Sequence, residues 1–94
     1  MSETIQTHHP DPGKQGVNIS KKKYEVIYTA IDAYLRDVET ASLKEITQAV
    51  KERVADTFEG SVGWYVTTVK LDMESQGILI CDRSKSPHVH YLAP

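Results

Sequence analysis

Hydrogen-bonding and basic side chains stand close together in the stretch GWYVTTVKLDMESQG, residues 63–77. The hydroxyls of Thr67 and Thr68 can hydrogen-bond to base edges in a DNA groove, and the ammonium of Lys70 can bind a backbone phosphate. Three further basic residues could contact the flanking phosphates. The candidate DNA-binding set is therefore Lys44, Thr67, Thr68, Lys70, Arg83 and Lys85.

The same stretch also carries large apolar side chains outside its predicted core stripe. On a helical wheel that stripe consists of Val62, Val66, Val69 and Met73. The opposite face presents Trp64, Thr67, Thr68, Leu71 and Ser75. Two interpretations of Trp64 and Leu71 stay open. Either the N-terminal arm or a β-hairpin covers them, or they are exposed and bind a protein partner, because tryptophan is enriched at the energetic centres of interfaces.

Charge argues against a simple DNA contact. The formal net charge is −2, and between residues 63 and 77 Lys70 is outnumbered by Asp72 and Glu74. We expect these two carboxylates to face the same surface as the threonines, where they would repel phosphate. The sequence also offers no pair of arginines there for the bidentate contact with guanine that is the commonest specific readout.

The remaining chemistry-bearing residues do not indicate a metal site or an active site. The potential metal ligands are His8, His9, Cys81, His88 and His90, and their spacing matches neither CxxC nor HxxxH. We interpret them as surface histidines and a small apolar cysteine. Residues 13–16 lack the spacing of a phosphate-binding loop, and no nucleophile elbow is present. The sequence therefore predicts no enzyme and no cofactor.

Length and composition predict one domain with a polar N-terminal extension. A chain of 94 residues holds a single small core. Residues 1–19 are rich in proline and glycine and predict an arm that is partly extended or disordered, and residues 20–94 predict the folded domain. The N-terminus lacks a signal-peptide pattern, and no apolar run is long enough to span a membrane, so we expect a cytoplasmic protein without a membrane partner. The sequence leaves the oligomeric state open.

Three helices are predicted from apolar periodicity and capping residues. Ser20 caps a helix of about sixteen residues whose apolar stripe recurs at three- and four-residue steps. Ser42 and Glu45 form a capping box at the start of the second helix. The third helix begins near residues 60–61 and ends at Gly77, a residue suited to the left-handed conformation after a helix.

A β-hairpin is predicted at the C-terminus. The runs ILICDR and HVHYL are joined by a four-residue loop, residues 84–87, and this register places Cys81 opposite His90. We expect the core face of the hairpin to consist of Ile78, Ile80, Val89 and Tyr91. The other face then carries Leu79, Cys81, His88, His90 and Leu92.

This order of elements is typical of an α+β winged helix, with a three-helix helix-turn-helix core and a two-stranded wing. The motifs HPDPGK, KKYE and GWYVTTVKLDMESQG resemble a family of short bacterial winged-helix proteins classed as a domain of unknown function. That resemblance implies a fold but no activity and no catalytic residues. The fold favours a transcription-regulator-like protein that binds double-stranded DNA. The alternative is a winged helix used as a protein–protein interaction module.

Overall fold

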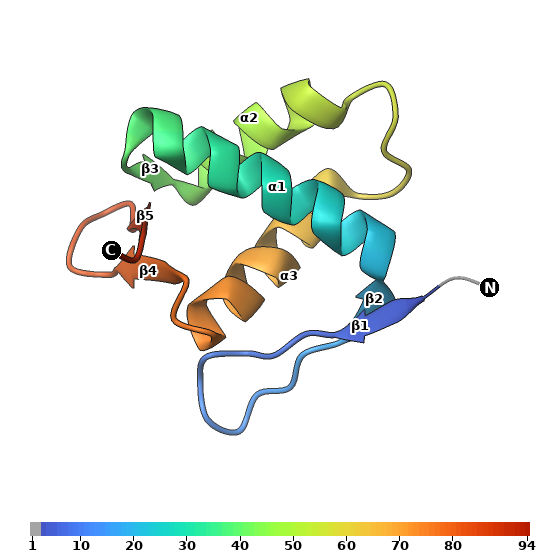
Figure 1. Ribbon diagram of the computed structural model, residues 1–94. Helices are drawn as coiled ribbons and strands as arrows, with labels where there is room; N and C mark the ends of the chain where they lie inside the picture. The colour runs from blue at the N-terminus through green and yellow to red at the C-terminus, as the bar shows by residue number, and fades with distance from the viewer. Residues whose placement is uncertain (1–2) are drawn as a thin grey trace.

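Three helices and two small antiparallel sheets make up the computed structural model, which describes residues 3–94 (Figure 1). The predicted arm includes residues 1 and 2, which lie outside the described part of the chain. The elements follow in the order β1 (Thr4–Gln6), β2 (Asn18–Ser20), α1 (Lys21–Val38), β3 (Ala41–Ser42), α2 (Leu43–Val54), α3 (Val62–Ser75), β4 (Leu79–Asp82) and β5 (Val89–Leu92). The mixed α+β class is thus confirmed.

Helix α1 begins at a serine cap that the sequence predicts and ends at a glutamate with an unusual backbone conformation. The Ser20 side chain accepts a hydrogen bond from the Lys23 N–H, as expected for an N-cap. At the other end Glu39 adopts a positive φ of 71°, and its N–H donates to the carbonyl of Leu35. The helix buries Ile27, Ile31 and Leu35 almost completely between α2 and α3.

The predicted capping box of α2 is confirmed. The Glu45 N–H donates to Ser42 Oγ at 3.2 Å, and the Ser42 N–H donates to Glu45 Oε1 at 2.9 Å. These two bonds satisfy backbone donors that a helix N-terminus would otherwise leave free. Ser42 also lowers the pKa of Glu45, first through its backbone N–H and then through its side chain, because both favour the charged form of the carboxyl group.

Helix α3 has the predicted boundaries and, with one exception, the predicted core side. Ser61 caps its start, and Gly77 follows its end with φ of +76°. Val66, Val69 and Met73 are fully buried. The expectation that Asp72 faces outward with the threonines is wrong, because this residue is 1% exposed. It lies three residues after Val69, on the edge of the buried stripe.

The C-terminal strands join a third strand that the sequence did not predict. The sheet order is β3–β5–β4, so β5 lies between the hairpin partner β4 and the short strand β3 that precedes α2. The predicted register is confirmed, since Cys81 lies opposite His90. The predicted core face is wrong: Leu79 and His90, both assigned to the outer face, are 2% and 1% exposed.

The buried face of the hairpin is the opposite of the predicted one for a physical reason. Both faces of β4 and β5 carry apolar side chains, so alternation alone could not distinguish them. The connection from α3 selects which face is buried. The Ile78 N–H donates to the Met73 carbonyl, and this bond fixes the orientation in which β4 leaves the helix. Leu79 then points into the core, and Ile80, Val89 and Tyr91 are only partly buried.

The N-terminal residues form a second, two-stranded sheet. Strand β1 pairs with β2, with Ile5 opposite the buried Ile19. Residues 7–17 connect the two strands, and we call them the arm loop. In Figure 1 this loop extends from the β1–β2 sheet beneath α3 toward the end of that helix. The extended parts of the predicted arm are therefore β1 and the start of β2.

Candidate functional site around helix α3

The arm loop is closed at its base by Thr7 and Val17. The Thr7 N–H donates to the Val17 carbonyl at 2.8 Å, and the Thr7 hydroxyl exchanges hydrogen bonds of 2.9 Å with both backbone groups of Val17. Gly16 passes so close that a Cβ there would lie 2.0 Å from the Thr7 carbonyl oxygen. Only glycine fits at this position, so the sequence specifies the closure of the loop.

A buried carboxylate attaches the arm loop to α3. Asp72 Oδ1 accepts the His8 N–H at 2.8 Å, and Oδ2 accepts from Gln76 Nε2 at 2.7 Å and from the Tyr24 hydroxyl. Burial of the phenol, and then its hydrogen bond to Asp72, raise the pKa of Tyr24 above its usual range. Asp72 thus joins the arm loop, α1 and α3 at one point and is no part of an outward DNA-facing surface.

The arm loop covers one side of the outer face of α3 and leaves the other side open. A cavity of about 120 Å³ remains between loop and helix. Its lining residues are Thr7, His8, His9, Gln15, Gly16, Val17, Trp64, Thr68 and Leu71. Leu71 is partly buried beneath the loop, whereas Trp64 remains 47% exposed. The arm loop therefore covers Leu71, as one of our two interpretations expected, but it leaves Trp64 largely exposed.

An aromatic cluster supports the exposed Trp64. Its ring lies edge-on to Tyr65, with centroids 4.9 Å apart, and Tyr65 in turn meets Phe58 edge-on at 5.1 Å. The Lys23 ammonium lies 5.6 Å from the Phe58 ring centroid and 5.4 Å from that of Tyr65. Such edge-to-face and cation–π contacts hold the rings in defined positions, so Trp64 is presented from a packed base.

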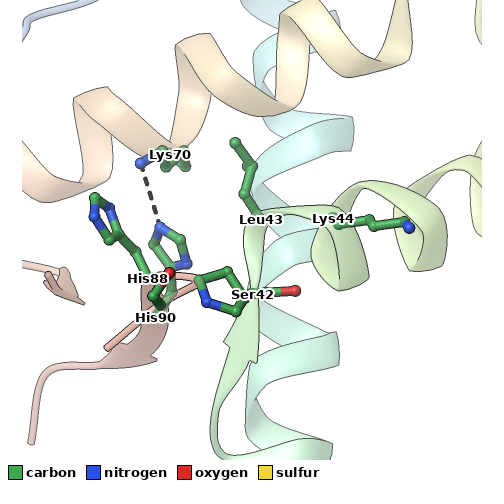
Figure 2. A pocket seen from close by; sticks show the side chains of 8 residues that line it. Ser42, Leu43, Lys44, Lys70, His88 and His90 are labelled. Atoms are coloured by element: carbon green, nitrogen blue, oxygen red, sulfur yellow. Dashed lines mark hydrogen bonds between the residues drawn. The ribbon is translucent and has the colours of Figure 1, made fainter. Parts of the chain in front are cut away.

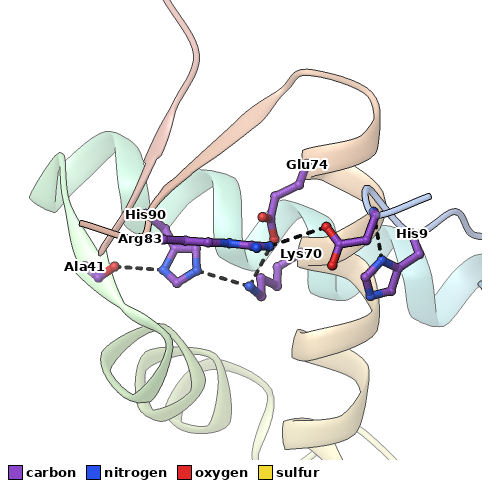
Figure 3. A network of polar contacts seen from close by, with 7 residues as sticks. His9, Ala41, Lys70, Glu74, Arg83 and His90 are labelled. Carbon is purple, nitrogen blue, oxygen red and sulfur yellow. Dashed lines mark hydrogen bonds and ion pairs between the residues drawn. The ribbon is translucent and has the colours of Figure 1, made fainter. Parts of the chain in front are cut away.

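Lys70, the central basic residue of the candidate DNA-binding set, is engaged inside the protein (Figure 3). Its Nζ lies 3.0 Å from Glu74 Oε2 in an ion pair without hydrogen-bond geometry, and the two side chains are 11% and 8% exposed. Nζ also lies 3.3 Å from His90 Nε2. A DNA phosphate would have to compete with both partners for this ammonium.

His90 is held as a neutral ring by its two neighbours. Nδ1 lies 3.2 Å from the Ala41 carbonyl, which can only accept, so Nδ1 carries the proton and Nε2 accepts from Lys70. Burial and, second, the Lys70 charge lower the pKa of His90 below its ordinary value. These two hydrogen bonds explain how an imidazole can occupy the core side of the hairpin.

A groove lies between the start of α2, helix α3 and the loop before β5 (Figure 2). Its volume is about 440 Å³, and it is lined by Ser42, Leu43, Lys44, Lys70, Ser86, Pro87, His88 and His90. The set contains basic and neutral residues and no carboxylate. The groove can therefore accommodate an anionic group beside the exposed Lys44 and His88.

The structure brings some of the predicted DNA-binding residues together and separates others. Lys44 and Lys70 line the same groove, and Lys85 is exposed in the hairpin loop next to it. Arg83 instead contacts the arm loop, with Nη2 3.7 Å from Asp11 Oδ1 (Figure 3). The two threonines are partly buried, and Thr68 lies beside the arm loop.

The sequence analysis did not predict the roles that Asp11, Asp72 and His90 have at this site. For Asp72 the helical wheel contains a usable signal, since its position borders the core stripe. The other two depend on contacts between distant segments, because Asp11 meets the hairpin and His90 meets β3. Local sequence carries no information about such pairs.

Among residues 3–94, no three His, Cys, Asp or Glu side chains lie close enough together to hold a metal ion. Cys81 is free and partly buried, and His9 Nδ1 accepts the Asp11 N–H at 3.0 Å within the arm loop. None of the helices in the described residues is long and apolar enough to cross a membrane.

Comparison with known proteins identifies a family without an assigned activity. Neither a curated protein nor a solved structure is significantly similar to the chain. The matching family model, described as a family of unknown function (DUF6958), covers residues 4–90. This span runs from β1 to β5, so the arm loop belongs to the matched region. The chain is therefore a member of this family of unknown function.

Proposed function

We propose that the protein is a small cytoplasmic winged helix that serves as a protein–protein interaction module. The order α1–β3–α2–α3–β4–β5, with β5 between β3 and β4, supports the winged-helix assignment. In that fold α3 is the recognition helix and β4–β5 form the wing. The observation that carries the proposal is the 47% exposure of Trp64 on the outer face of α3.

The covered and paired side chains on the outer face of α3 favour a protein partner over DNA. The arm loop lies along Thr68 and Leu71, and Lys70 is paired with Glu74, so α3 presents no unpaired basic residue to a major groove and the loop restricts access to Thr68. A packed tryptophan beside an apolar cleft instead fits the anchor residue of a protein interface.

Co-purification from the native cells tests this proposal. Truncation of an anchor residue costs about 2 kcal/mol or more, which is roughly a thirty-fold loss of affinity. We therefore expect Trp64→Ala to lose a cross-linked protein partner that the native chain retains. Val26→Ala is the matched control, because Val26 is an exposed apolar residue on α1 with 37% exposure. A partner retained equally by both variants would contradict the assignment to Trp64.

Double-stranded DNA is the second candidate partner, in keeping with a role in transcriptional regulation. The groove between α2 and the hairpin loop favours it, because the groove has basic and neutral lining residues and lies beside Lys44 and Lys85. Phosphates rather than bases would be the contacts at this place. Such binding would be weak, since few exposed cations are available there.

Titration of a random-sequence duplex, followed by fluorescence anisotropy, distinguishes this candidate. Because phosphate binding releases counterions, we expect affinity to fall steeply between about 50 and 200 mM salt. Lys44→Gln and Lys85→Gln should each weaken binding and reduce its salt dependence, whereas Lys51→Gln at the far end of α2 should not. Binding that is undetectable at low salt would exclude a DNA role.

A further inference from the structure

The outer face of α3 continues from the exposed Trp64 under the arm loop. Trp64, Thr68 and Leu71 follow at steps of four and three residues, so their side chains share one face of the helix. The arm loop lies against this face and forms the cavity of about 120 Å³ with it. A partner that contacts Trp64 therefore meets the edge of the loop.

The arm loop is held to the rest of the protein by few contacts. No residue from His8 to Gly16 is buried, although both ends of the loop connect to a packed strand pair. Its polar attachments to other elements are the His8 N–H bond to Asp72 and the exposed Asp11–Arg83 ion pair at 3.7 Å. Exposed ion pairs of this kind contribute little to stability.

Movement of the loop removes one of the three hydrogen bonds that the Asp72 carboxylate accepts and keeps the other two. Asp72 would lose only the His8 N–H from Oδ1, since Gln76 and the Tyr24 hydroxyl both bind Oδ2. The Thr7–Val17 hydrogen bonds lie at the base of the loop, where the β1–β2 ladder ends. Residues 8–16 can thus swing as a unit while the strands remain paired.

We infer that the arm loop is a displaceable cover over the outer face of α3. When it is closed, the interaction surface is limited to Trp64. When it opens, Thr68 and Leu71 join Trp64 in one continuous apolar-centred surface. The role of this opening in partner binding rests on the proposed interaction function, and the opening itself does not.

Amide hydrogen exchange of the full chain measures the opening directly and without a partner. The His8 N–H should exchange through a local opening and so be much less protected than the Val69 N–H in the core of α3. Asp11→Ala removes the ion pair with Arg83 and should speed His8 exchange about two- to five-fold with no change at Val69. Equal protection of the two amides would overturn the inference.

A glycine pair provides a second, matched comparison. Gly16→Ala places a Cβ against the Thr7 carbonyl and should abolish His8 protection, whereas Gly63 lies in α3 without a positive φ and a Cβ there meets only Thr47 Cγ2, at 4.0 Å. Because Trp64 is the only tryptophan, acrylamide quenching of fluorescence should increase in Gly16→Ala and stay unchanged in Gly63→Ala. Unchanged quenching in Gly16→Ala together with intact His8 protection would also overturn the cover. A loop that opens in these measurements, without any partner being found, would refute the proposed function and leave the cover standing.

Discussion

The buried carboxylate of Asp72 accepts hydrogen bonds from three segments of the chain. Its bonds to the His8 backbone, the Tyr24 hydroxyl and the Gln76 amide leave both oxygens occupied. A charged group with this many hydrogen bonds can be buried without the full cost of desolvation. Its role is therefore to hold the arm loop, α1 and α3 together.

Replacement of Asp72 should destabilise the protein strongly. Asp72→Ala leaves the buried Tyr24 hydroxyl without a partner, which alone costs about 1–3 kcal/mol. We expect a loss in the free energy of unfolding of at least this size in urea denaturation, and a smaller loss for Asp72→Asn, which keeps one acceptor oxygen. Asp56→Ala, at an exposed position after α2, is the control. Equal losses for Asp72→Ala and Asp56→Ala would contradict this role.

We predict that the buried His90 makes the folded protein less stable in mild acid. Its folded-state pKa is lowered by burial and by Lys70, so the folded protein binds this proton less readily than the unfolded chain. Stability from this group is complete above the unfolded pKa of about 6.5 and falls as the pH drops toward the lower folded value. Urea midpoints measured between about pH 7.5 and 5 should decrease in the native protein.

The control for this pH dependence is His88→Gln, which removes an exposed histidine two residues away. This variant should retain the decrease. His90→Gln should be less stable at neutral pH but should lose most of the dependence between pH 7.5 and 5. A dependence that is unchanged in His90→Gln would assign the effect to another group.

At the scale of elements, the arm loop and the hairpin meet above the C-terminal half of α3. Asp11 from the loop contacts Arg83 from the hairpin (Figure 3), and the Lys70–Glu74 pair on α3 is nearly buried. Two neighbouring elements thus restrict the helix that a winged helix would use for recognition. The N-terminal part of α3, with Trp64, remains the accessible end.

For the whole molecule, charge and surface lead to the same ranking of partners. The net charge of −2 provides no general attraction to DNA, and the basic residues beside the α2 groove form only a small local patch. The exposed tryptophan on a rigid aromatic base is the more specific feature. A protein partner is consequently the first proposal and duplex DNA the second.

The sequence by itself determined the features that depend on near neighbours. Ser20, Ser42 and Gly77 act within three or four residues of their position, and the apolar stripe of α3 repeats within one helix, so these predictions were confirmed. The register of the hairpin was likewise fixed by its short loop.

Only the tertiary structure decided what these elements meet. The contacts of His8 with Asp72, of Ala41 with His90 and of Asp11 with Arg83 join residues about 50 to 70 positions apart. Such pairs form only after the helices have packed, because chain geometry brings them together and no local preference encodes them. For this reason the contact of Lys70 with His90, the core face of the hairpin and the half-covered surface around Trp64 could not be predicted from the sequence.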